Sequence, residues 1–147
     1  MGHLNEVITA VQCHPSQGST FAYSSSRGVI NMCDLRSSAL CTSAARSFFN
    51  PRRKNDEFVK NSFIADILNS ISDINFSGDG RYIFSRDYLS VKVWDTAMCG
   101  SLPVETVHLH EHFRPALTDL FNSDSIFDKF GICCSKDGKS FATGSYK

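Results

Sequence analysis

The chain has 147 residues, of which 41% are hydrophobic and 20% charged, a composition that fits one folded domain and excludes a disordered chain. Fifteen Lys and Arg residues balance fifteen Asp and Glu residues, so no net charge attracts the chain to nucleic acid or to an anionic membrane. No segment approaches the roughly 20 apolar residues that a membrane-spanning helix requires. We therefore expect neither nucleic acid nor a membrane among its partners.

The cysteines indicate a reducing compartment. Six occur, and no two form a Cys-x-x-Cys pair, which argues against a zinc site or a thioredoxin-like site. The N-terminal residues lack the basic flank and apolar stretch of a secretory signal. We expect a cytoplasmic protein, with the nucleus as a second location. Because no glycine-rich phosphate loop occurs, we expect no cofactor.

The first repeating unit spans residues 7–47 and alternates apolar strand residues with polar turns. Strand-forming residues fill 7–13, 20–24 and 29–34, and the turns between them contain Pro, Gly and Ser. An insertion is predicted at 48–70, and it ends in an apolar patch that includes Phe63 and Ile67.

The second unit, residues 71–109, contains the most informative stretch of the chain. In residues 82–95, strand-forming residues are interrupted at Arg86-Asp87, where a tight turn is expected. Asp87 precedes Trp94 at the spacing that WD-repeat propeller blades use for a turn aspartate and a strand tryptophan. We expect Asp87 and Trp94 to form a structural blade lock, because a buried carboxylate with several hydrogen bonds stabilises its surroundings.

A second insertion, at 108–125, carries apolar residues at helical spacing. The third unit, residues 127–147, repeats the pattern of a strand, a polar turn and a strand. The three units together predict an all-β fold, a partial WD-repeat β-propeller of about three blades with short helical insertions. Functional residues on propellers lie mostly on loops, so we expect a platform for protein–protein interaction.

Catalytic and metal sites have little support in the sequence. No Gly-x-Ser-x-Gly motif occurs, and we expect no enzyme. His108, His110 and His112 alternate, as ligands on one face of a strand do, which leaves a metal-dependent hydrolase as a third hypothesis. Because no further ligand cluster is evident, we assign no metal site.

Two short motifs remain. Arg52-Arg53-Lys54 is a basic run for which a solvated loop is favoured over a phosphate-binding or nuclear-import role. Asp34-Leu35-Arg36 is similar to the Trp-Asp-x-Arg ending of WD-repeat receptors for cullin-ring ubiquitin ligases, although Cys33 stands in place of the tryptophan. A ubiquitin-ligase substrate receptor is therefore the alternative function.

A more specific match lies in several segments that resemble the B-type WD-repeat regulatory subunit of serine/threonine protein phosphatase 2A. Arg86–Lys92 and Ile126–Phe130 are specific to that family beyond the general pattern of propellers. The other matching segments are Tyr23–Gly28, Cys33–Cys41, Ser70–Ser77, Ser85–Asp95, Pro103–Thr106 and Asp124–Phe130.

This resemblance implies a seven-bladed propeller to which the chain contributes about three blades. It also implies a non-catalytic regulator of phosphatase activity that binds the scaffold (A) and catalytic (C) subunits and presents phosphoprotein substrates. The substrate groove of that family crosses one face of the propeller. It carries over to Leu4, Val7, Phe121, Asp124, Phe127 and Lys129. An apolar floor with charged neighbours suits a helical or extended peptide.

The chain departs from the family pattern at several positions. Residues 50–54 are basic where the family usually carries an acidic stretch, and Phe121 stands where a tyrosine is expected. His108 and His112 also differ from the pattern, whereas His110-Glu111 matches it.

Overall fold

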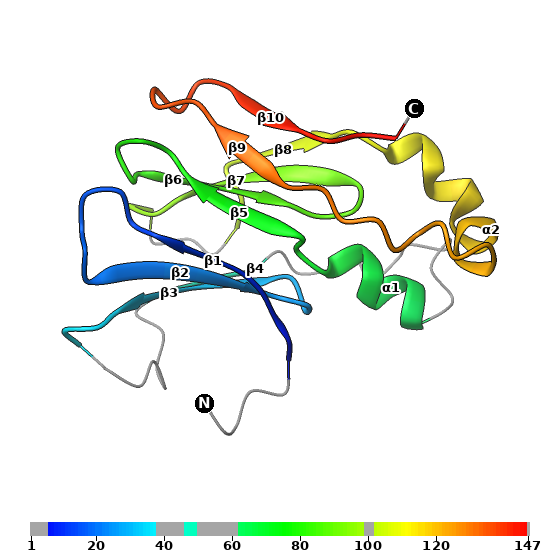
Figure 1. Cartoon of the computed structure of the whole chain (residues 1–147), viewed down its shortest axis with the longest axis horizontal. Helices are drawn as coiled ribbons and strands as arrows, with labels where there is room; N and C mark the ends of the chain where they lie inside the picture. The colour runs from blue at the N-terminus through cyan, green and yellow to red at the C-terminus, as the bar shows by residue number, and fades with distance from the viewer. Residues whose placement is uncertain (1–5, 38–45, 50–61, 99–101, 147) are drawn as a thin grey trace.

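The computed structural model describes residues 6–37, 46–49, 62–98 and 102–146. Most of its regular structure is antiparallel β-strand, in two four-stranded sheets and one two-stranded sheet that stack on one another (Figure 1). This arrangement confirms the all-β fold class and a partial WD-repeat propeller with short helical segments. In the described part, no helix is long and apolar enough to cross a membrane.

The first sheet is a meander in which each strand pairs with the next along the chain. It consists of β1 (Ile8–Cys13), β2 (Thr20–Ser25), β3 (Val29–Asp34) and β4 (Arg46–Phe49). Strand β4 includes residues 48 and 49, which the sequence pattern assigned to the first insertion. The reason is burial: Phe48 pairs with Ile30 and is only 2% exposed, so its apolar side chain belongs to the core.

The second sheet repeats this meander with β5 (Asp73–Phe76), β6 (Tyr82–Arg86), β7 (Ser90–Asp95) and β8 (Glu105–His108). The third sheet consists of β9 (Ile132–Cys134) and β10 (Phe141–Thr143). Because each sheet has two faces, the middle sheet must present apolar residues on both.

Strand β6 shows how the middle sheet does so. Ile83 packs into the core between the first and second sheets, and the next residue, Phe84, packs into the core toward the third sheet. In β7, Trp94 packs into the core between the first and second sheets, and Val91 packs into the core toward the third sheet. Successive side chains of a strand point to opposite faces, so two apolar neighbours serve two different cores.

The turns between the first two strands of each sheet lie at one end of the stack (Figure 1). A Cβ added at Gly80 would lie 2.2 Å from the His14 ring of the preceding sheet. A Cβ added at Gly78 would lie 2.3 Å from the Lys136 carbonyl oxygen of the following sheet. These approaches are too short for any side chain, so glycine sets the spacing between the sheets at this end.

Helices gather at the other end of the stack (Figure 1). They are α1 (Ser62–Asn69), the 3₁₀-helix η1 (Glu111–Ala116) and α2 (Leu117–Asn122). Ile64 of α1 and Leu117 of α2 share a buried cluster with Tyr88, Leu89 and Ile126. The helices are therefore fixed to the β6–β7 turn of the middle sheet rather than extended into solvent.

The expected blade lock between Asp87 and Trp94 takes a different form. The Trp94 Nε1–H donates to Ser85 Oγ at 2.8 Å, on the neighbouring strand. The Asp87 carboxylate instead accepts hydrogen bonds from the backbone N–H groups of Leu89 and Ser90, at 3.0 and 2.7 Å, and pairs with Lys92. Asp87 thus stabilises the β6–β7 turn and Trp94 ties β7 to β6, as two separate contacts.

Candidate functional site

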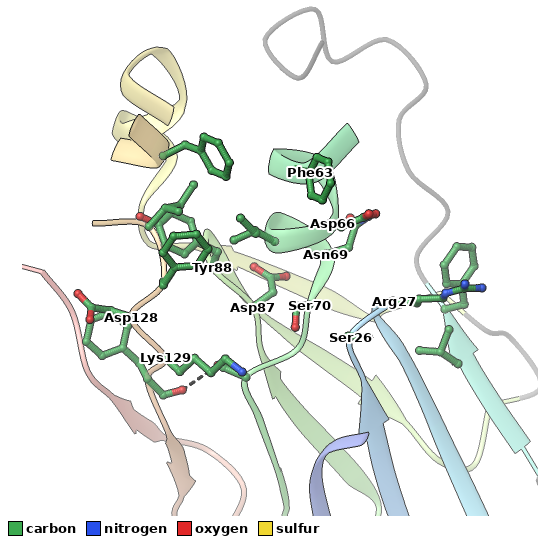
Figure 2. A pocket seen from close by; sticks show the side chains of 18 residues that line it. Ser26, Arg27, Phe63, Asp66, Asn69, Ser70, Asp87, Tyr88, Asp128 and Lys129 are labelled. Carbon is green, nitrogen blue, oxygen red and sulfur yellow. Dashed lines mark hydrogen bonds between the residues drawn. The ribbon is translucent and has the colours of Figure 1, made fainter. Parts of the chain in front are cut away.

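A cavity of about 970 Å³ opens at the helical end of the structure. Figure 2 shows its wall formed by α1, by the β2–β3 and β6–β7 turns and by the segment that follows α2. These segments come from the first and second sheets, from both predicted insertions and from the stretch that leads into β9. The cavity therefore exists only because the sheets stack, and no single unit of the repeat contains it.

Apolar side chains supply much of the lining. Phe63 of α1 is 70% exposed and Phe127 is 53% exposed, although both are large apolar residues. Exposed apolar residues that gather in one hollow mark a surface for a ligand or protein partner. The other apolar lining residues are Val29, Phe49, Ile67, Phe121, Ile126 and Phe130.

Charged and polar groups surround this apolar surface. Arg27 and Ser26 lie on the β2–β3 turn, Asp66 and Asn69 lie on α1, and Asp128 and Lys129 lie on the segment after α2 (Figure 2). Asp87 also lines the cavity, but its carboxylate is bound by Lys92 and by the turn backbone. The rim therefore carries charge of both signs at separate places, which suits a ligand with an ordered charge pattern.

Three of the six predicted groove residues line this cavity, namely Phe121, Phe127 and Lys129. Val7 is 68% exposed, and its backbone is hydrogen bonded to that of Ser26, whose side chain lines the cavity. Asp124 is exposed on the turn after α2 with φ at 56°, and it is not a lining residue. Leu4 lies outside the described residues.

The sequence pattern did not identify three parts of the wall as functional. These are helix α1, the turn at Ser26-Arg27, and Tyr88. The apolar patch at Phe63 and Ile67 was the available signal, because apolar residues in an insertion need either a core or a partner. Tyr88 lies in the family-specific run Arg86–Lys92, but that run did not indicate a cavity, because the place of Tyr88 beside it follows from the stacking of the sheets.

The metal hypothesis has no geometric support. His108 Nδ1 lies 2.7 Å from Glu111 Oε1, and His112 is exposed. His110 is buried and hydrogen bonded to other partners. Within residues 6–37, 46–49, 62–98 and 102–146, no three His, Cys, Asp or Glu side chains converge as a metal site requires. The basic run at 52–54 lies outside the described residues.

The Asp34-Leu35-Arg36 motif is engaged within the chain. The Arg36 guanidinium contacts the Asp34 carboxylate at 2.7 Å, in the turn after β3. Hydrogen bonds from the Arg36 side chain and backbone lower the pKa of Asp34 to about 2. Arg36 thus has a local structural role in this turn.

Known proteins similar to this chain are regulatory subunits of one phosphatase. The chain is 51% identical over 146 residues to the B alpha isoform of the 55 kDa regulatory subunit of serine/threonine protein phosphatase 2A from Oryza sativa subsp. japonica. Identity is also 51% to the B beta isoform from Arabidopsis thaliana and 46% to the 55 kDa regulatory subunit from Drosophila melanogaster.

Each of these alignments covers 99% of this chain but only 24 to 28% of the relative. The chain therefore spans about a quarter of the length of the curated relatives that it matches. No protein-family model matches it. The resemblance to the B-type regulatory subunits is confirmed over this length, whereas the ligase-receptor alternative gains no support.

Proposed function

We propose that this chain acts as part of a non-catalytic regulatory subunit of protein phosphatase 2A. In this role it binds the scaffold and catalytic subunits and recruits phosphoprotein substrates, in the cytoplasm and the nucleus. The observation that carries the proposal is a sequence identity of 46 to 51% to proteins named as regulatory subunits, over 146 residues.

The cavity supports a recruiting role. Its exposed aromatic residues, Phe63 and Phe127, lie on separate segments and present an apolar surface wide enough for a peptide. An amphipathic helix or an extended segment places apolar side chains on such a surface and leaves its polar groups at the rim. Asp66, Asp128 and Lys129 then select the charge pattern of that peptide.

Assembly with the phosphatase is tested by co-purification. The complete protein that carries this segment should recover the phosphatase scaffold and catalytic subunits in equal amounts from a mixture of the purified proteins. Recovery of a purified cullin-ligase adaptor in their place would refute the proposal and favour the alternative.

Substrate recruitment is tested at the cavity. Phe127→Ser removes an exposed lining side chain, and Met98→Ser is a matched control because Met98 is 55% exposed and does not line the cavity. On an array of phosphopeptides, the assembled complex with Phe127→Ser should lose binding at least tenfold and the control should not. Equal binding by the two variants would contradict a peptide site in this cavity.

A further inference from the structure

His110 is a buried histidine that does not line the cavity itself but contacts two lining residues, Tyr88 and Phe130. It is 1% exposed and follows β8, at the junction of the middle and third sheets. Its ring packs against Phe113, Phe130 and Tyr146, at centroid distances of 5.5, 6.2 and 5.4 Å. A buried imidazole needs partners for both nitrogens, and those partners decide which nitrogen carries the proton.

The Nδ1 atom of His110 has two competing neighbours. Arg86 Nη2 lies at 3.1 Å, and the carbonyl oxygen of Tyr88 also lies at 3.1 Å. A guanidinium group can only donate hydrogen bonds, so a hydrogen bond from Arg86 requires an unprotonated Nδ1. A carbonyl only accepts, so a bond to Tyr88 requires a proton on Nδ1. The two bonds exclude each other.

The other ring nitrogen decides between them. His110 Nε2 lies 2.9 Å from Ser145 Oγ, and the Ser145 hydroxyl donates to the Tyr146 carbonyl at 3.1 Å. Because that hydroxyl proton is already used, Ser145 Oγ accepts from Nε2–H. The neutral ring with its proton on Nε2 therefore satisfies Arg86, Ser145 and Tyr146 together.

We propose that His110 is a positioning residue and a pH-sensitive latch. The neutral ring joins the β6–β7 turn to the segment after β10, through hydrogen bonds with Arg86 and Ser145. When the ring is protonated, Nδ1 loses the hydrogen bond from Arg86 and donates to the Tyr88 carbonyl oxygen instead. Tyr88 and Phe130 both line the cavity and both contact His110. Protonation therefore changes the contacts of two residues that line the cavity. The latch itself does not depend on the proposed function, but its effect on peptide binding does.

Arg86 makes the protonated state costly. Its side chain is 0% exposed, its Nη1 donates to the Ser90 carbonyl at 3.3 Å, and its guanidinium lies over the Phe130 ring. Its Nε has no hydrogen-bond partner among the described residues. A protonated His110 would place a second positive charge beside the buried Arg86 guanidinium. Repulsion between two charges is stronger in a buried site than in water.

The carboxylates around His110 already have partners, and Asp128 is engaged by the hydroxyl of Tyr146. Glu111 is bound by Arg114 and His108, and Asp87 is bound by Lys92. His112 adds a further positive charge when it is protonated, and Tyr146 is held in its neutral form because burial raises its pKa. Burial lowers the pKa of His110, and Arg86 and His112 lower it further, while the Tyr88 carbonyl acts in the opposite direction.

The latch is tested by nuclear magnetic resonance of the full chain labelled with ¹⁵N-histidine, from pH 8 to pH 5. We expect the His110 ring to carry its proton on Nε2, and to remain mostly neutral at pH 6.5, the ordinary pKa of histidine. His110→Asn and His112→Gln assign the two rings. Contacts with Phe113 and Tyr146 assign His110 in the unmodified protein if His110→Asn does not fold.

The positioning role has its own readout. The backbone amide signals of Tyr88 and Phe130 should shift with the same pH midpoint as the His110 ring, and the shift should vanish in His110→Asn but persist in His112→Gln. A proton on Nδ1 in the neutral ring, or half-protonation of His110 at or above pH 6.5, would overturn the proposal. A Phe130 amide signal that does not shift with the pH midpoint of the His110 ring would also overturn the proposal. None of these readouts involves the phosphatase, so they can fail while the proposed function stands.

Discussion

The indole of Trp94 is hydrogen bonded to Ser85, a diagonal neighbour on the adjacent strand. The Nε1–H to Oγ distance is 2.8 Å, and both residues are at most 2% exposed. The direct cross-strand partner of Trp94 is Ile83, which packs in the same core. The one tryptophan of the chain therefore connects two strands through a polar contact inside an apolar cluster.

Ser85→Ala should destabilise the fold by about 1–3 kcal/mol, because it leaves a buried indole N–H without a partner. Urea unfolding followed by Trp94 fluorescence measures the change. Ser47→Ala is the control, since Ser47 is exposed and its hydroxyl contacts only Asn31 among the described residues. Equal, small losses for both variants would show that the Trp94 contact contributes nothing.

Asp87→Ala should cost about 2–3 kcal/mol, because the buried carboxylate accepts several hydrogen bonds within the β6–β7 turn. The native fluorescence of Trp94 should stay unchanged, since Asp87 does not bind the indole. Asp79→Ala, in the exposed β5–β6 turn, should cost less. A changed Trp94 spectrum in folded Asp87→Ala would restore the direct pairing that the sequence spacing suggested.

Gly78→Ala should destabilise the fold by about 1–3 kcal/mol, because the new Cβ would lie 2.3 Å from the Lys136 carbonyl oxygen of the next sheet. Gly18→Ala is the matched control, with no atom within 4 Å of the added Cβ, and should change stability by less than about 0.5 kcal/mol. Thermal unfolding of both variants checks this prediction. Similar midpoints would mean that the turns are not in close contact.

Stability should fall as the pH drops below 6.5, the ordinary pKa of histidine. The pKa of His110 is lowered in the folded chain, so the unfolded chain binds more protons between 6.5 and that lower value. The contribution of the neutral ring is complete above pH 6.5 and is lost as the pH falls toward the folded pKa. Urea midpoints at pH 7.5 and 5.5 should differ more for the unmodified chain than for His110→Asn. An identical difference in both proteins would exclude His110 as the source.

Asp124→Asn should weaken binding of the phosphopeptides selected by the cavity by at most about fivefold, as expected for an exposed charge outside the cavity lining. Asparagine tolerates the backbone φ of 56° at this position, so the variant removes charge without strain. Asp119→Asn, on the exposed face of α2, is the control. Titration of the assembled complex measures both affinities. Equal affinities of the Asp124→Asn and Asp119→Asn variants would show that Asp124 does not contribute to peptide binding.

Strand positions were largely predictable because propeller strands alternate with polar turns. Residues 20–24 and 29–34 were expected as strands, and β2 and β3 occupy them. The cavity was harder to predict, because its wall combines Arg27, Phe63 and Tyr88 from different sheets and helices. Local sequence periodicity carries no information on which turns will lie together once the sheets stack. The partner of Trp94 was missed for a related reason: spacing indicated Asp87, whereas cross-strand register selects Ser85.

The contrast between the two ends of the stack has a consequence for divergence. At the end with Gly78 and Gly80, a single added methyl group collides with a neighbouring turn. At the opposite end, where the helices gather (Figure 1), side chains from both insertions line a cavity of about 970 Å³ (Figure 2). We therefore expect changes of length or side-chain chemistry to cost less stability at the second end than at the first. Recognition of a different ligand could then arise at the helical end while the contacts at Gly78 and Gly80 keep the neighbouring turns close together.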